Sequence, residues 1–152
     1  MNNLDYIKII PMQIKHIKEI LKIEKESFKT PWTKDSFENE IKSNKLAYYI
    51  IAINELDIIY GYAGLWHIIN EGHITNIAVS KSFQNKGIAT KMISHLIEYA
   101  KNNNIIGLTL EVRDSNICAR KLYEKIGFIY EGVRPGYYQD SGEDALIMWK
   151  RF

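Results

Sequence analysis

Two side chains of this sequence have the chemistry of an acid–base pair. Glu111 interrupts the otherwise apolar run Leu-Thr-Leu-Glu-Val. A carboxylate in such a strand is either a solvated side chain or a desolvated group in a cleft, where it can take a proton. Tyr123 falls on the apolar stripe of the next helical segment, so it is either a core residue or a proton donor. Residue type alone leaves both alternatives open.

A polar loop between an apolar run and a helical pattern is a candidate anion site. It reads Gln84-Asn85-Lys86-Gly87-Ile88-Ala89-Thr90. The glycine allows a ligand to approach the backbone closely, and the following helix begins with unpaired N–H groups at its positive end. The loop is neither a P-loop nor a G-x-G-x-x-G dinucleotide site. The local pattern predicts either phosphate binding or a simple reversal of the chain.

The other reactive side chains indicate neither a metal site nor a covalent nucleophile. His16, His67, His73 and His95 lack the spacing of metal ligands. Cys118 has no accompanying His or Asn at catalytic spacing, and we expect it to be a small buried residue. A single cysteine excludes an internal disulfide and suits a reducing compartment. We therefore expect chemistry without a metal.

Length and composition indicate one globular domain. The 152 residues are 46% hydrophobic and 25% charged, which is ordinary for a soluble domain spanning residues 1–152. A net charge of +2 gives no indication of nucleic-acid or membrane binding. Charged residues interrupt the N-terminal segment, so it predicts no signal peptide, and the apolar run at 46–53 is far shorter than the roughly 20 residues of a membrane span. We expect a cytoplasmic protein.

The apolar periodicities predict the order β-α-α-β-β-β-α-β-α-β-β, a three-layer α/β (α+β) domain with a mixed sheet. Strands are expected at 6–10, 46–53, 58–68, from a turn at 70–72 to Val79, and at 108–112, 128–133 and 145–149. One helix follows the apolar stripe from Ile14 to Phe28, a second is capped by Thr33, and a third starts at Ile88. A fourth follows the cap residue Asn116 and ends at Gly127. The strands on either side of the third helix should be parallel neighbours.

Four stretches together resemble a known family. They are FKTPWTKDSF, NIAVSKSFQNKGIATKMISHLIEYA, LEVRDSNICARKLYEKIGF and GYYQDSGEDALIM, in this order and over nearly the whole chain. This set is similar to the ribosomal-protein-alanine N-acetyltransferase branch of the GNAT family of N-acetyltransferases. The resemblance implies a GNAT-like domain with a mixed, mostly antiparallel sheet of about seven strands and four flanking helices. It also implies acetyl-CoA as co-substrate, no metal, and a protein N-terminus as acceptor, expected to be the alanine of a small-subunit ribosomal protein.

The resemblance assigns roles to particular residues. Glu111 would be the general base and Tyr123 the general acid. Backbone groups of Ile77, Ala78 and Val79 would bind the pantetheine arm, together with Asn116. The N–H groups of the loop would bind the pyrophosphate, which implies Gln84, Asn85, Lys86, Gly87, Ile88, Ala89 and Thr90. We expect Pro31, Trp32, Tyr137 and Tyr138 to line the peptide groove.

The loop departs from the family pattern at three positions. Many members have arginines where this chain has Asn85 and Lys86, and a glycine where it has Ala89. Backbone N–H groups survive these changes, but some side-chain charge for the phosphates is lost.

The chemistry of amine acylation agrees with these roles. An α-amino group has a pKa of about 7.7–8.0, whereas a lysine near 10.4 is almost never neutral at pH 7. A single carboxylate is therefore sufficient help for an α-amine, and a tyrosine hydroxyl can protonate the leaving thiolate. Lysine side chains, polyamines or other small amines are alternative acceptors, and a non-catalytic acyl-CoA-binding domain is a third interpretation. The acidic stretch from Asp140 to Asp144 either meets a cationic peptide amine or is a solvated turn.

Overall fold

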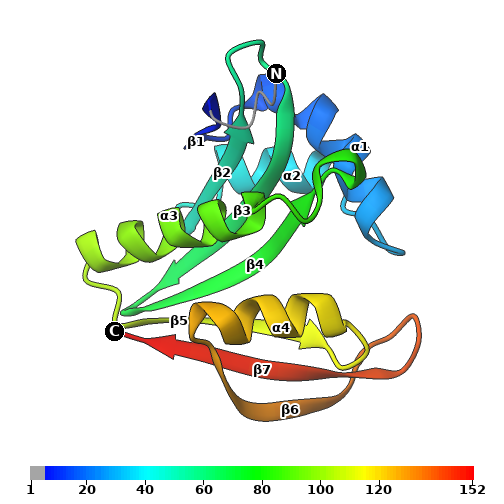
Figure 1. Cartoon of the computed structure of the whole chain (residues 1–152), viewed down its shortest axis with the longest axis vertical. Helices are drawn as coiled ribbons and strands as arrows, with labels where there is room; N and C mark the ends of the chain where they lie inside the picture. The colour runs from blue at the N-terminus through cyan, green and yellow to red at the C-terminus, as the bar shows by residue number, and fades with distance from the viewer. Residues whose placement is uncertain (1–5) are drawn as a thin grey trace.

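The computed structural model describes residues 6–152, and its elements follow the predicted order (Figure 1). The strands are β1 (Lys8–Pro11), β2 (Ala47–Ile53), β3 (Ile59–Ile68), β4 (Glu71–Val79), β5 (Gly107–Arg113), β6 (Ile129–Tyr138) and β7 (Glu143–Arg151). The helices are α1 (Ile17–Ser27), α2 (Lys34–Lys42), α3 (Ile88–Asn102) and α4 (Ile117–Ile126), with short 3₁₀ turns at Ile14–His16 and Lys81–Phe83.

The seven strands form one mixed sheet in the order β1-β2-β3-β4-β5-β7-β6. All neighbours are antiparallel except β4 and β5, which are parallel and are connected through α3. This arrangement confirms the predicted fold class and the predicted parallel pair, because a strand–helix–strand unit returns its second strand beside the first in the same direction.

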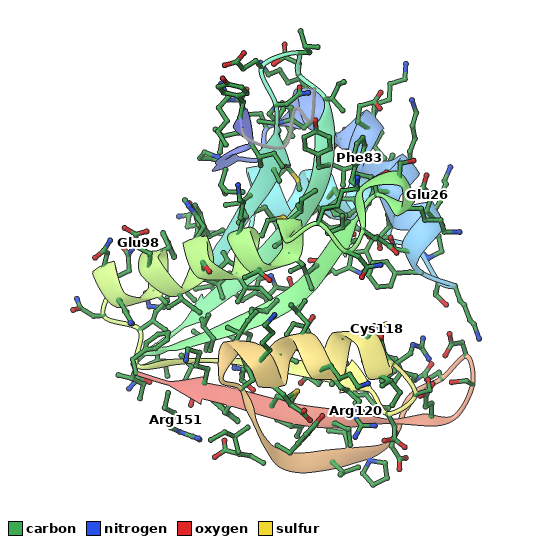
Figure 2. All side chains as sticks on the ribbon, in the orientation of Figure 1. Glu26, Phe83, Glu98, Cys118, Arg120 and Arg151 are labelled. Carbon is green, nitrogen blue, oxygen red and sulfur yellow. The ribbon has the colours of Figure 1, made fainter. Side chains whose placement is uncertain are left out.

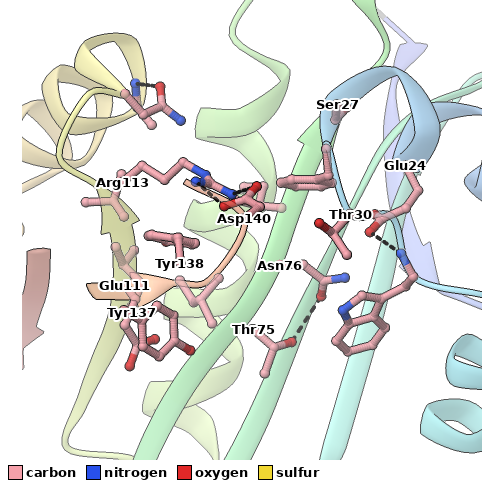
Figure 3. Close-up of a pocket in the computed structure, with 18 of the residues that line it drawn as sticks. Glu24, Ser27, Thr30, Thr75, Asn76, Glu111, Arg113, Tyr137, Tyr138 and Asp140 are labelled. Carbon is pink, nitrogen blue, oxygen red and sulfur yellow. Dashed lines mark hydrogen bonds and ion pairs between the residues drawn. The ribbon is translucent and has the colours of Figure 1, made fainter. Parts of the chain in front are cut away.

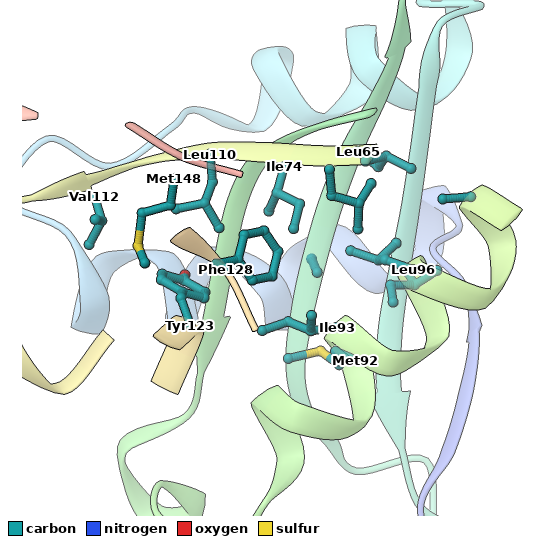
Figure 4. Close-up of a cluster of buried hydrophobic side chains, with 14 of the residues drawn as sticks. Leu65, Ile74, Met92, Ile93, Leu96, Leu110, Val112, Tyr123, Phe128 and Met148 are labelled. Carbon is teal, nitrogen blue, oxygen red and sulfur yellow. The ribbon is translucent and has the colours of Figure 1, made fainter. Parts of the chain in front are cut away.

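Helices cover both faces of the sheet and bury two separate apolar clusters. Ile93 and Leu96 of α3 and Tyr123 of α4 pack on one face against Leu65 and Leu110 (Figure 4). On the other face, Ile17 and Ile20 of α1 and Phe37 of α2 pack against Ile51 and Tyr62. The domain therefore has three layers, and the alternation along β5 turns Glu111 away from the cluster that holds Leu110.

The two parallel strands pair only at one end. Backbone pairing joins Glu71–His73 to Gly107–Thr109, and beyond these residues β4 and β5 diverge (Figure 1). The β5-facing edge of β4 from Ile74 to Val79 is consequently unpaired with β5. Unpaired N–H and C=O groups on such an edge can bind an extended ligand in the manner of an added strand.

A β-bulge in β4 changes which residues face which layer. Gly64 pairs with Asn76 and Leu65 with Ile74, so Thr75 is an extra residue on this strand. Ile74 packs in the cluster beneath α3, whereas Ala78, four residues on, packs in the cluster beneath α1. The extra residue thus inverts the period-two alternation and turns the side chains of the strand at the point where β4 and β5 separate.

Most predicted element boundaries agree with the structure. Thr33 Oγ1 accepts the N–H of Ser36 at 3.2 Å, Asn116 Oδ1 accepts that of Ala119 at 3.2 Å, and Gly127 ends α4 with φ of 112°. These contacts confirm the three predicted caps.

The bounds of β1 and β7 differ from the prediction by one or two residues at each end. Three other boundary predictions were wrong. The predicted turn at 70–72 lies one residue earlier, at Ile69 and Asn70, so Glu71 and Gly72 belong to β4. Helix α1 ends at Ser27, and Phe28 is extended and 37% exposed rather than on the buried stripe. Strand β6 continues from its predicted end at residue 133 as far as Tyr138. In residues 6–152 no helix is long and apolar enough to cross a membrane.

Candidate active site

Two adjoining pockets open where β4 and β5 diverge. The first, which we call the strand pocket, has a volume of about 520 Å³ and lies between α1, β4, β5 and the end of β6 (Figure 3). The second, which we call the loop pocket, has a volume of about 450 Å³ and lies between β4, the loop before α3, and α4. Residues that line both pockets are Ser27, Phe28, Ile77, Asn116, Ala119 and Tyr123. The two pockets therefore meet at the start of α4.

The loop pocket contains every residue predicted to bind acetyl-CoA except Lys86. Asn85 and Gly87 have positive φ values of 60° and 81°, and α3 begins directly after Gly87. A Cβ atom placed on Gly87 would meet nothing within 4 Å, so space is open beside this backbone. Left-handed residues at a helix start turn backbone N–H groups toward one point, which is an arrangement suited to an anion.

Lys86 is the one predicted cofactor-binding residue that does not line the loop pocket. It is exposed between the two left-handed residues, so its side chain is in solvent. Figure 2 labels Glu26, Phe83 and Cys118, which line the loop pocket from α1, the turn before the loop, and α4. The Glu26 carboxylate accepts the N–H of Lys81 at 3.2 Å and joins α1 to that turn. Cys118 is exposed, so the expectation of a buried cysteine was wrong.

Tyr123 lies at the junction of the two pockets. Its ring packs on Phe128 with 5.7 Å between centroids, and the side chain is 6% exposed. Burial raises the pKa of its hydroxyl well above the ordinary value, and no hydrogen bond from the described part of the chain opposes that shift. The hydroxyl therefore stays protonated at physiological pH and has a proton to donate to a group entering either pocket.

Glu111 lies in the strand pocket. Its carboxylate is 25% exposed and forms an ion pair of 3.3 Å with the guanidinium of Arg134 on β6. Arg134 is itself 54% exposed, so this pair is solvated and weak enough to exchange for another cation. Glu111 is thus accessible to an amine in the pocket.

The acidic turn between β6 and β7 is tied to β5. Arg113 donates to both carboxylate oxygens of Asp140, at 3.1 and 2.8 Å, and lies 3.6 Å from Glu143. Its guanidinium also lies 4.0 Å from the ring centroid of Tyr138. The hydrogen bond from Arg113 lowers the pKa of Asp140, and burial raises the pKa of Tyr138 to about 12.

These contacts bear on the role of the acidic stretch. Asp144 also accepts a backbone bond within the hairpin, from the N–H of Gly136 at 2.9 Å. The acidic side chains thus tie the β6–β7 hairpin to β5 and hold its two strands together, and Tyr137 and Tyr138 of this hairpin lie in the wall of the strand pocket. Because these carboxylates are already paired, they do not form a free anionic site for a cationic ligand.

Trp32 also lines the strand pocket, whereas Pro31 does not. Trp32 packs on Phe37 with 5.4 Å between ring centroids, and this contact anchors the segment between α1 and α2. Pro31 precedes it in the chain but makes no part of the pocket surface. Three of the four predicted groove residues therefore come together, from two segments more than a hundred positions apart in the sequence.

The sequence interpretation missed several polar residues of the strand pocket, among them Glu24 and Asn76. Glu24 is 2% exposed, and Asn76 follows the bulged Thr75. A signal for Glu24 was present, because it lies between Ile20 and Phe28 at helical spacing, on a stripe that is otherwise apolar. Nothing in the sequence indicated the bulge that places Asn76. Within residues 6–152, no group of three or more His, Cys, Asp or Glu side chains could hold a metal ion.

Comparisons with known proteins match this architecture. The model of the acetyltransferase (GNAT) family matches residues 17–128. A Bacillus subtilis protein provisionally named a ribosomal protein bS18-alanine N-acetyltransferase is 39% identical over 91% of this chain and 91% of its own length. The Haemophilus ducreyi protein named a ribosomal protein bS18-alanine N-acetyltransferase is 35% identical over 85% of this chain and 89% of its own length.

A solved structure agrees with the sequence relatives. The crystal structure of the ribosomal-protein-S18-alanine N-acetyltransferase from Escherichia coli has a TM-score of 0.86 and 26% identity, and the match covers 95% of this chain and 93% of that one. The family model covers most of the chain, and two relatives exceed 30% identity over most of their length. The chain therefore belongs to the GNAT family of acetyl-CoA-dependent N-acetyltransferases.

Proposed function

We propose that this protein transfers the acetyl group of acetyl-CoA to the α-amine of a protein N-terminus, and that its acceptor is the N-terminal alanine of the small-subunit ribosomal protein bS18. The observation that carries the proposal is the position of Tyr123 at the junction of the two pockets, with Glu111 in the strand pocket. The names of the two bacterial relatives support the acceptor.

The loop pocket has the groups that acetyl-CoA requires. The unpaired edge at Ile77, Ala78 and Val79 would bind the amide groups of the pantetheine arm, and the N–H groups from Gln84 to Thr90 would bind the pyrophosphate. Asn116 uses Oδ1 to cap α4, so its amide nitrogen remains available to the same arm. When bound, acetyl-CoA supplies the acetyl thioester at the junction of the pockets.

Glu111 and Tyr123 would move the two protons of the reaction. Glu111 accepts a proton from the acceptor's ammonium, directly or through a water, and leaves a neutral nitrogen able to attack the thioester carbon. Tyr123 donates its proton to the sulfur as the carbon–sulfur bond breaks, and the second proton of the acylated nitrogen passes through water to the phenolate left on Tyr123. Backbone N–H groups on the free edge of β4 near Val79 would stabilise the negative charge on the carbonyl oxygen.

Two features favour an α-amine over the alternative acceptors. An α-amine loses its proton near pH 8, whereas deprotonation of a lysine at the same pH costs several kcal/mol more, at about 1.4 kcal/mol per pKa unit. Glu111 is the one carboxylate proposed as base, which is sufficient for the α-amine. A polyamine would favour a pocket rich in free carboxylates. Asp140 and Glu143 are instead paired with Arg113.

The test is acetylation of matched peptides, followed by mass spectrometry. One peptide has a free N-terminal alanine, and the second has the same sequence with a blocked N-terminus and one internal lysine. Spermidine is a third acceptor. We expect rapid labelling of the first peptide and far slower labelling of the second peptide and of spermidine. Equal or faster labelling of the lysine peptide or of spermidine would contradict the proposed acceptor.

A further inference from the structure

Two buried polar atoms of the strand pocket lack a hydrogen-bond partner in the part of the chain that the structure describes. They are Oε2 of Glu24 and Nδ2 of Asn76, and neither finds a hydrogen-bond partner within residues 6–152. Tyr62 has a third such atom, but it lies in the apolar cluster beneath α1 and lines neither pocket. An unpaired buried polar group costs about 1–3 kcal/mol, so proteins rarely retain one without a use.

Glu24 is held in place by only one of its two carboxylate oxygens. Oε1 accepts the backbone N–H of Trp32 at 3.0 Å, which fixes the carboxylate against the segment between α1 and α2 (Figure 3). Oε2 has no such bond, and burial raises the pKa of the group. The second oxygen is therefore a hydrogen-bond acceptor in the wall of the pocket that still lacks a donor.

Asn76 is oriented by a chain of hydroxyl groups. The Tyr49 hydroxyl lies 3.1 Å from Thr75 Oγ1, and Thr75 in turn donates to Asn76 Oδ1 at 3.0 Å. The bulge at Thr75 makes this chain possible, because it turns two successive side chains out of the regular alternation. With its oxygen engaged, Asn76 has a free amide N–H donor next to Ile77, which lines both pockets.

We propose that Glu24 and Asn76 are positioning residues that recognise the first peptide group of the acceptor. Asn76 Nδ2 donates to the carbonyl oxygen of the first residue, and Glu24 Oε2 accepts the N–H of the second. The inference rests on the proposed function and extends it from the amine to the main chain. A peptide has both groups, whereas a polyamine has only N–H donors, so Asn76 would select against polyamines.

Neither atom is exposed to solvent in the free protein, so the acceptor must displace pocket-lining side chains to reach them. The coil between α1 and α2 includes Thr30, which is exposed and lines the pocket beside Glu24 and Asn76 (Figure 3). A hydrogen bond to an atom kept out of contact with water is stronger than one at the surface.

The test uses analogues that remove one group of the first peptide bond at a time. The parent peptide begins with alanine. One analogue has that bond reduced to CH₂–NH and so lacks the carbonyl, and the other has an ester in its place and so lacks the N–H. We would measure kcat/KM by mass spectrometry and Kd by calorimetry with CoA-loaded protein, for the wild type, Asn76→Ala and Glu24→Gln. Thr30→Ala, in the same wall without an unpaired buried atom, is the control.

We expect the wild type to prefer the parent peptide over each analogue. Asn76→Ala should weaken the preference over the reduced analogue by about tenfold, the effect of one hydrogen bond of about 1.4 kcal/mol, and leave the ester preference unchanged. Glu24→Gln should do the reverse, and Thr30→Ala should change neither ratio. Wild-type ratios in both variants would overturn the inference while the proposed function stands. If the wild type acetylates no peptide, the proposed function fails, and the ratios of Kd values from calorimetry still test whether Glu24 and Asn76 recognise the peptide group. Absence of any peptide binding would overturn that inference.

Discussion

Replacing Tyr123 by phenylalanine removes one atom and separates its proposed catalytic role from its structural one. Within residues 6–152 the hydroxyl makes no hydrogen bond that would oppose its raised pKa, while the ring packs on Phe128 and lies in the cluster beneath α3 and α4. Phenylalanine keeps the ring contacts and leaves no buried group unpaired. The free energy of unfolding should therefore change by less than about 1 kcal/mol.

The effect on the rate should be much larger. General acid catalysis contributes roughly 10²–10⁴-fold, which corresponds to about 3–5 kcal/mol of activation free energy. We expect kcat of Tyr123→Phe to fall by that factor at saturating acetyl-CoA. Because burial raises the pKa of this hydroxyl, the wild-type rate should also show no decline caused by its ionisation below about pH 10.

The assay pairs turnover with urea unfolding on the same samples. Tyr123→Ala is the control, since removal of a buried aromatic ring costs about 3–5 kcal/mol of stability whatever the chemistry. A Tyr123→Phe variant with a rate within a few-fold of wild type would return this residue to a purely structural role. A large loss of stability in that variant would show that the hydroxyl has a structural partner after all.

Two further predictions concern single residues of the pockets. Gly87→Val should abolish acetyl-CoA binding in calorimetry, because φ is +81° and the added side chain would occupy the open space beside the loop; unchanged affinity would contradict the phosphate assignment. Glu24→Gln should gain stability relative to the wild type as the pH rises above about 4.5, the ordinary pKa of the carboxyl. Burial raises the pKa of Glu24 in the folded protein, so between the unfolded-state pKa and the folded-state pKa only the unfolded chain ionises, and the wild type loses about 1.4 kcal/mol of unfolding free energy per pH unit. Urea midpoints from pH 4 to 7 measure this, and a constant difference would refute it.

The sequence by itself determined the elements and much of the loop pocket. The alternation of Leu108, Leu110 and Val112 and the caps at Thr33, Asn116 and Gly127 are local signals, because they depend on backbone geometry over a few residues. The loop before α3 is equally local, since the groups that we propose to bind the phosphates are its own backbone N–H groups. Residues of this kind are predictable because their neighbours in the chain are also their neighbours in space.

The strand pocket depends on tertiary structure. Its wall joins Glu24, Asn76 and Tyr138, which meet only when α1, β4 and the β6–β7 hairpin pack around the divergence of two parallel strands. The acidic turn was ambiguous until its partner Arg113 was known, because a carboxylate's role depends on which cation lies beside it.

The unpaired donor of Asn76 depends on one extra residue in the pairing of β3 with β4. A bulge is set by the register of two strands, and the residues of β4 alone carry no mark of it. The chain thus specifies locally where acetyl-CoA would bind, whereas the surface that would receive the acceptor exists only once distant segments are packed together.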